Sequence, residues 1–111
     1  MGRGSQSADG KENARWGLII RDDAEADIED VFGWYETRSV GLGTRFMQAL
    51  DEAFTALRFM PEMYPAVHQS LRRVLLNRFP YVVYHRIDGE SVEIVGVLHA
   101  KREPSSWQRR R

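Results

Sequence analysis

The sequence predicts a small α+β domain in which a hairpin of two helices packs on a twisted antiparallel sheet. Two observations carry this prediction. Apolar residues recur first at the spacing of helices and then, after Pro65, at the spacing of strands. Asp88-Gly89, within the extended part, is a pair typical of a two-residue β-hairpin turn. The length of 111 residues fits one such domain.

The first part of the chain predicts a strand followed by a helix. The short apolar run Trp16–Ile20 is typical of a strand. Asp22 or Asp23 is then expected to cap a helix, because an aspartate side chain accepts hydrogen bonds from free backbone N–H groups. This helix is expected from about Ala24 to Arg38, with apolar residues at Ala24, Ile28, Val31, Phe32 and Tyr35.

A second helix is expected after Gly41 and Gly43, and Pro61 and Pro65 are expected to end it. Its main apolar stripe consists of Leu42, Phe46, Leu50, Ala53 and Leu57. Because only a few residues join the two helices, they should lie antiparallel as a hairpin.

Three strands are expected in the remaining chain, at Arg72–Arg78, Tyr81–Ile87 and Ser91–His99. Gly96 indicates a bulge or a close contact within the last of them. The order of elements is therefore β-α-α-β-β-β. Short connections make the last three strands antiparallel, and the helix hairpin should cover one face of their sheet.

Composition sets limits on location and chemistry. The chain has no cysteine, which excludes disulfides and thiolate metal sites. Residues 1–15 are polar and read as a disordered tail or a remnant of an expression vector, so that residues 16–111 form the single domain. Since no apolar run is long enough to cross a membrane, we expect a cytoplasmic protein without membrane contact.

Charge is unevenly distributed along a chain of zero net charge. Residues 1–52 hold 6 basic and 11 acidic residues, whereas residues 53–111 hold 10 basic and 5 acidic ones. The strand half therefore carries a net charge of +5. This asymmetry predicts either a basic surface on one side of the molecule or two solvated faces that neutralise each other.

Motifs of common enzymes and cofactors are missing, and the spacing of His68, His85 and His99 matches no common zinc pattern. We therefore expect neither a cofactor nor a metal. The strands interleave arginines with tyrosines and histidines, a set that could hold RNA across a scissile phosphate. The alternative is an ordinary sheet, in which Tyr84 belongs to the core and His99 packs beside Val95 and Val97.

In its order of elements and in three short sequence motifs, the chain resembles the RelE/ParE superfamily, whose members are often labelled plasmid-stabilisation proteins. The motifs are Gly-Leu-Gly-Thr-Arg-Phe from Gly41, Arg-Phe-Pro-Tyr from Arg78 and Val-Leu-His-x-x-Arg from Val97. The resemblance covers about residues 16–110. It implies a cytoplasmic toxin of a type II toxin–antitoxin module, neutralised by a cognate antitoxin.

The superfamily divides by target, and the resemblance implies different roles in each branch. RelE-like members are ribosome-dependent endoribonucleases that cleave mRNA, and ParE-like members inhibit DNA gyrase without chemistry of their own. In a RelE-like protein the catalytic residues would be Arg72, Tyr84, His99 and Arg102. The basic surface expected of a ribosomal nuclease is sparse here, because Arg58 is the one lysine or arginine in residues 47–71. We therefore favour the ParE-like branch and keep a non-toxic, protein-binding member as a further alternative.

We also expect an antitoxin segment to bind beside the helix hairpin. Two short helices are not expected to bury all of their large apolar residues, so some should remain exposed as a groove for an amphipathic segment. The basic strand half would favour an acidic segment. The partner-binding residues expected on these grounds are Phe46, Leu50, Phe54, Arg73 and Arg86. The sequence leaves the oligomeric state open.

Overall fold

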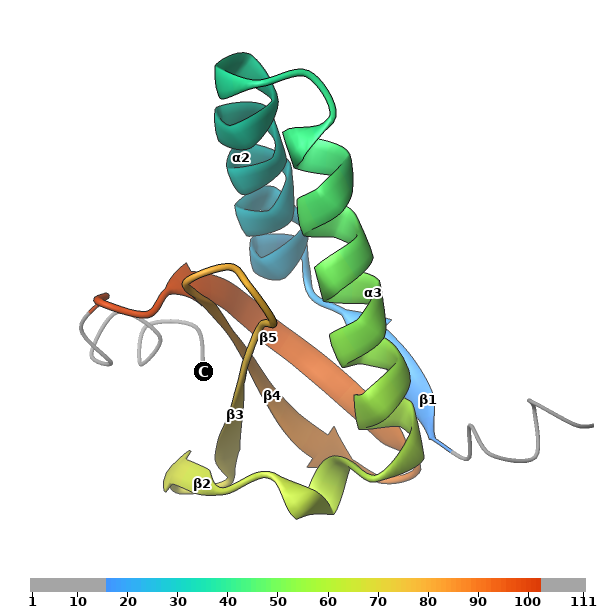
Figure 1. Ribbon diagram of the computed structural model, residues 1–111. Helices are drawn as coiled ribbons and strands as arrows, with labels where there is room; N and C mark the ends of the chain where they lie inside the picture. The colour runs from blue at the N-terminus through green and yellow to red at the C-terminus, as the bar shows by residue number, and fades with distance from the viewer. Residues whose placement is uncertain (1–15, 103–111) are drawn as a thin grey trace, which may run out of the picture.

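The computed structural model describes residues 16–102, and the expected tail at residues 1–15 lies outside this part, as do residues 103–111 (Figure 1). No helix within the described part is both long and apolar enough to cross a membrane. The elements in chain order are β1 (Gly17–Ile20), α2 (Asp22–Arg38), α3 (Leu42–Phe59), the short 3-10 helix η1 (Pro61–Met63), β2 (Ala66–His68), β3 (Leu71–Leu75), β4 (Tyr81–Asp88) and β5 (Ser91–His99).

The strands form one five-stranded sheet in the order β1-β5-β4-β3-β2. Strands β2 to β5 pair antiparallel, as expected for the last three of them. The sheet as a whole is mixed rather than antiparallel, because β1 runs parallel to β5. The sequence analysis also missed β2, an edge strand of three residues with an irregular register that leaves no alternating apolar pattern.

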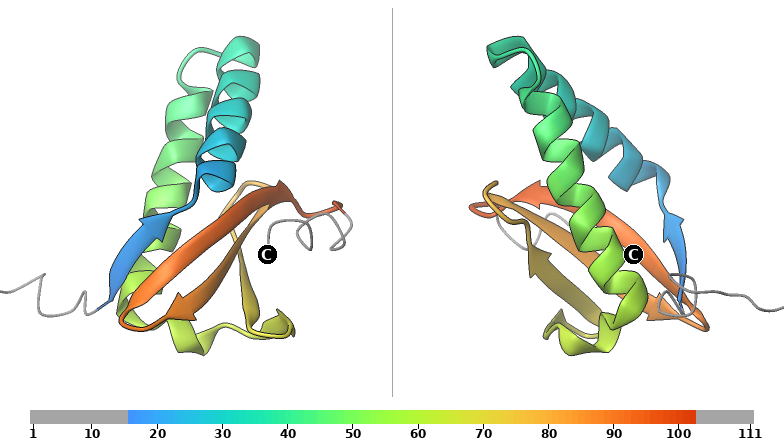
Figure 2. Two further views of the ribbon diagram at one scale, coloured as in Figure 1. Left: turned by 180° about the vertical axis from the view of Figure 1, so that it is seen from behind. Right: turned by 45° about the vertical axis from the view of Figure 1, so that its right-hand side comes forward.

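Both helices lie on one face of this sheet and form the expected antiparallel hairpin. The end of the hairpin that carries the turn between α2 and α3 projects beyond the sheet (Figures 1 and 2). Helix α2 begins slightly earlier than expected, with Arg21 as its N-cap and no side-chain cap. The expectation that Asp22 or Asp23 caps the helix is wrong, since both lie inside its first turn. There their carboxylates favour the positive end of the helix dipole.

A carboxylate holds the turn between the two helices. The backbone N–H groups of Gly41 and Gly43 each donate to the Glu36 side chain, at 2.9 Å. Gly41 has a φ of 91°, a conformation that glycine adopts without a steric penalty. Gly43 is buried where the helices approach closely, because a Cβ atom there would lie 2.8 Å from the Phe32 ring and from Glu36 Oε1.

This turn predicts opposite effects for two glycine substitutions. Gly43→Ala should lower the free energy of unfolding by about 1–3 kcal/mol, because the methyl group forces the helices apart. Gly33→Ala should raise it by about 0.5–1 kcal/mol, because a Cβ atom at this helical position meets nothing within 4 Å. Chemical denaturation of both variants measures the difference, and equal stabilities would show that the helices do not pack this closely.

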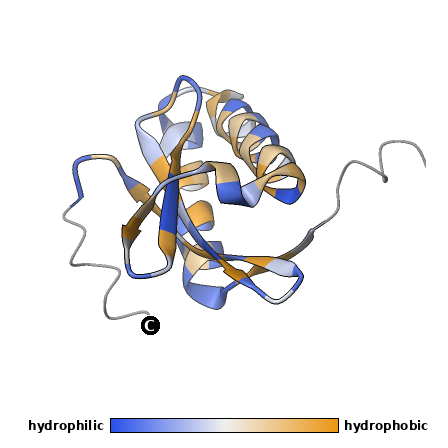
Figure 3. Ribbon diagram, turned by 90° about the horizontal axis from the view of Figure 1, so that it is seen from below, coloured by the Kyte–Doolittle hydropathy of each residue, from blue (hydrophilic) through white to orange (hydrophobic). Residues whose placement is uncertain are grey.

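The main core lies between the helices and the sheet, and its most buried members include Phe46, Leu57, Val83 and Ile94. Figure 3 shows hydrophobic and hydrophilic residues sharing each of the two long helices, as expected for elements with one buried side. Helix α2 is also joined to β5 by a polar contact. The Asp27 carboxylate accepts a hydrogen bond from the Val97 N–H group at 2.9 Å.

A second apolar cluster lies on the sheet face opposite the helices. Its buried members are Leu71, Val82, Tyr84, Val95 and Leu98. The register between β4 and β5 shifts next to Gly96, which confirms the first of the two alternatives expected there, a bulge. Because of this shift Val95 joins the second cluster whereas Val97 faces the helices, so the expectation that these two valines share a face is wrong.

Candidate functional site

Two of the residues named for a RelE-like nuclease lie on opposite faces of the sheet. Arg72 pairs in register with His85, and Tyr84 is the next residue along β4. One terminal nitrogen of Arg72 donates to the backbone carbonyl groups of Tyr64, at 2.6 Å, and Glu62, at 3.3 Å. Tyr84 is buried in the second cluster, as the alternative interpretation of an ordinary sheet predicts. Arg72 and Tyr84 therefore cannot face the same substrate atom in this arrangement.

The other two nuclease candidates lie together at the far end of β5. His99 pairs with Tyr81, and their rings meet edge to face with centroids 5.2 Å apart. Its Nδ1 atom accepts a hydrogen bond from the Lys101 N–H group, and its carbonyl group accepts one from the Arg102 N–H group. His99 is three residues along β4 and β5 from the level of Tyr84, which is roughly 10 Å. The four residues do not form one centre.

The expected partner-binding residues are also divided. Phe46 and Leu50 are buried, at 0% and 2% exposure, so the expectation that they line an exposed groove is wrong. Phe54 is partly buried and packs against the same core. The expectation that some apolar surface beside this helix remains exposed is confirmed at Met47 and Phe59 of α3 and at Met60, its C-cap.

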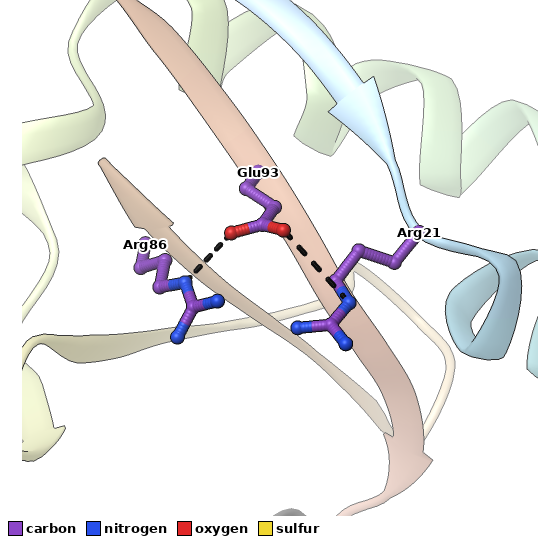
Figure 4. A network of polar contacts seen from close by, with 3 residues as sticks. All are labelled: Arg21, Arg86 and Glu93. Carbon is purple, nitrogen blue, oxygen red and sulfur yellow. Dashed lines mark hydrogen bonds and ion pairs between the residues drawn. The ribbon is translucent and has the colours of Figure 1, made fainter. Parts of the chain in front are cut away.

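Arg73 and Arg86 belong to the opposite face of the sheet, away from the helices. Arg86 Nε donates to Glu93 Oε1 at 2.7 Å, and Glu93 also approaches Arg21 Nε at 3.8 Å (Figure 4). A carboxylate shared between two arginines offsets part of the positive charge on this face. Arg86 therefore offers a partner less charge than the sequence alone indicated.

The structure instead forms a groove between α3 and the loop that joins β3 to β4. Its volume is about 560 Å³, and its lining residues are Leu42, Arg45, Gln48, Ala49, Glu52, Asn77, Arg78 and Phe79. Arg45, Gln48 and Glu52 recur along one polar stripe of α3, which is a signal present in the sequence. That this stripe faces the loop is decided by the tertiary packing, so the sequence analysis missed the groove.

Two unpaired arginines define the electrostatics of this groove. Arg45 and Arg78 are exposed, and neither side chain makes a hydrogen bond or an ion pair with any residue in the range 16–102. Glu52 also lines the groove, so the cations do not dominate it entirely. The arrangement can hold an anionic group at one point and a cationic or polar group beside it.

His85 is a buried polar residue rather than an accessible one. It is 0% exposed, and neither ring nitrogen has a hydrogen-bond partner among the described residues. Burial lowers the pKa of His85 from 6.5 to about 4, although the nearby Pro61 and Val83 carbonyl groups favour the protonated ring and the Arg72 charge opposes it. The Tyr64 ring meets it edge to face at 6.0 Å. His85 is therefore neutral at pH 7 and cannot stack on a base.

No group of three or more histidine, aspartate or glutamate side chains in residues 16–102 is placed to hold a metal ion. The fold and this site define the class of small α+β proteins in which a helix hairpin packs on a strongly twisted sheet, with a groove beside the second helix.

Comparisons with known proteins agree with this class. The family model of the ParE toxin of the type II toxin–antitoxin system parDE matches residues 18–104. The chain therefore belongs to the ParE toxin family. A solved structure of a chromosomal ParDE toxin–antitoxin system from P. aeruginosa superposes with a TM-score of 0.69, covering 78% of this chain and 97% of that one. The two sequences are 18% identical, so this likeness shows the fold. No curated protein matches the chain.

Proposed function

We propose that this protein is the toxin of a ParDE-type module, that it stops growth by inhibiting DNA gyrase in the cytoplasm, and that a cognate antitoxin neutralises it. Membership of the ParE toxin family supports the toxin role. The main support for gyrase rather than mRNA as the target is that Arg72 and Tyr84 lie on opposite faces of the sheet. A ribosomal nuclease needs its catalytic groups around one phosphate.

The charge of the described surface supports the same choice. Arg72 is occupied by two backbone carbonyl groups, Arg86 is paired with Glu93, and His85 is buried. These three residues therefore do not contribute to a basic path along the strands on which mRNA could lie. An inhibitor that acts by protein binding needs no such path.

Induced expression in a bacterium tests the proposal, with DNA replication and translation followed separately by incorporation of labelled thymidine and labelled methionine. Thymidine incorporation should fall first, while methionine incorporation continues through the same interval. Purified protein should inhibit DNA supercoiling by gyrase, and the co-expressed antitoxin should relieve both effects. His99→Ala is the matched variant and should remain toxic, because a binding inhibitor needs no acid or base.

Two other results would assign the protein differently. Early loss of methionine incorporation, with mRNA cut at ribosome-occupied codons and no cutting by His99→Ala, would identify a RelE-like nuclease. Normal growth on expression of the folded protein would identify a non-toxic binding member of the fold.

A further inference from the structure

We propose that the groove between α3 and the β3–β4 loop binds an acidic segment of the antitoxin, with one carboxylate held between the guanidinium groups of Arg45 and Arg78. This inference rests on the proposed function, because the partner is the antitoxin of the module. It names the chemistry of the contact and the residues that recognise it.

The first support is the availability of these two arginines. Several other arginines of the described chain are occupied: Arg58 donates to the Trp16 carbonyl group, and Arg72 donates to two carbonyl groups. The side chains of Arg73 and Arg102 have no such partner among the described residues either, but they do not line this groove. Arg45 and Arg78 come from different elements, line the same groove and have no such partner within residues 16–102. A guanidinium group presents a planar set of donors that matches a carboxylate.

The second support is the backbone of Arg78, which has a φ of 71°. A left-handed conformation is strained for a long side chain, whereas glycine adopts it freely. No hydrogen bond or ion pair of the Arg78 side chain with another residue in the range 16–102 offsets this strain. Strained residues cluster at binding sites, where the fold holds a side chain in the position that its ligand requires.

The third support concerns the rigidity of the groove and its choice of ligand. Phe79, one lining residue, packs against the rings of Tyr35 and Phe46, at centroid distances of 5.1 and 5.7 Å. A volume of about 560 Å³ accommodates several side chains and thus a peptide segment rather than a single ion. Glu52 in the lining repels a chain of phosphates, which brings several negative charges into the groove, more than it repels one carboxylate. The whole protein also has zero net charge, so it does not attract a polyanion at long range. These features favour a protein carboxylate over a nucleic acid.

The probe is the protein encoded by the reading frame next to this gene, purified and titrated by calorimetry against the full-length toxin. Arg45→Gln and Arg78→Gly should each weaken binding by about 10- to 100-fold, because each removes a charged contact. Arg78→Gly should melt at the same temperature as the wild type or higher, since glycine relieves the positive φ. Lys101→Gln is the matched control, removing one exposed charge outside the groove, and should bind within about twofold of the wild type.

The outcomes separate the two proposals. If both groove variants fold and bind the antitoxin as tightly as the wild type, the groove inference is overturned while the proposed function stands. If the wild-type toxin binds no product of the adjoining frame, both are overturned. A labelled single-stranded RNA provides the remaining comparison. If the wild type binds this RNA, and the groove variants lose RNA binding but keep antitoxin binding, the groove serves nucleic acid and the inference is wrong.

Discussion

Phe46→Ala should lower the free energy of unfolding by about 3–5 kcal/mol, as is typical when a large aromatic side chain is removed from a core. The Phe46 side chain is 0% exposed, and its ring lies against three others. Ring centroids are 5.8 Å away at Tyr35, 5.7 Å at Phe79 and 5.9 Å at Tyr81. Because a domain of this size is stabilised by only about 5–15 kcal/mol, this loss removes a large fraction of its stability.

Phe59→Ala is the matched control, because it removes the same ring from the same helix where the side chain is 48% exposed. It should change the free energy of unfolding by less than about 1 kcal/mol. Urea denaturation followed by circular dichroism measures both variants. Equal losses would contradict the placement of Phe46 in the core. The prediction also matters for binding studies, since weaker antitoxin binding by a Phe46 variant would report loss of folding rather than loss of a contact.

The second large effect is a dependence of stability on pH that arises from His85. The unfolded chain binds a proton at this residue below about pH 6.5, whereas the folded protein binds it only near the lowered pKa of about 4. The contribution of the neutral ring is therefore complete above pH 6.5 and is lost as the pH falls towards 4. Over this interval the free energy of unfolding should fall by about 3 kcal/mol.

His85→Leu isolates this contribution, because leucine fills a similar space and cannot be protonated. At pH 7.5 the variant should be at least as stable as the wild type, since both ring nitrogens lack hydrogen-bond partners among the described residues. Between pH 6.5 and 4.5 its stability should decline less steeply, while the carboxylates shared by both proteins titrate equally. Parallel pH profiles of the two proteins, measured by denaturation, would show that His85 is protonated without opening the fold.

Much of the fold was predictable because it depends on local spacing. The periods of apolar residues predicted both helices and the antiparallel strands β3 to β5, and Gly41 with Gly43 predicted the turn between the helices. Gly96 predicted the bulge in β5. The burial of Tyr84 followed from its alternation with Val82. The resemblance of three short sequence motifs predicted the ParE family, and the match of the family model over residues 18–104 confirmed it.

The site was less predictable, because it depends on which surfaces meet. The spacing of Phe46 and Leu50 placed them on one stripe of α3, but a stripe does not show how much of its width the sheet covers. In the same way, the sequence showed Arg86 as a cation, while only the neighbouring strands bring Glu93 and Arg21 to it. Contacts between residues far apart in the chain have no local pattern from which to be inferred.

The sequence by itself determined the two helices, four of the five strands and their order, since these follow from the periods of helices and strands. Tertiary structure decided three further features: the parallel pairing of β1 with β5, the separation of Arg72 from Tyr84, and the groove that Arg45 and Arg78 line. The physical reason is that these features arise from packing between distant segments, where burial of apolar surface selects one arrangement among several that the local patterns allow.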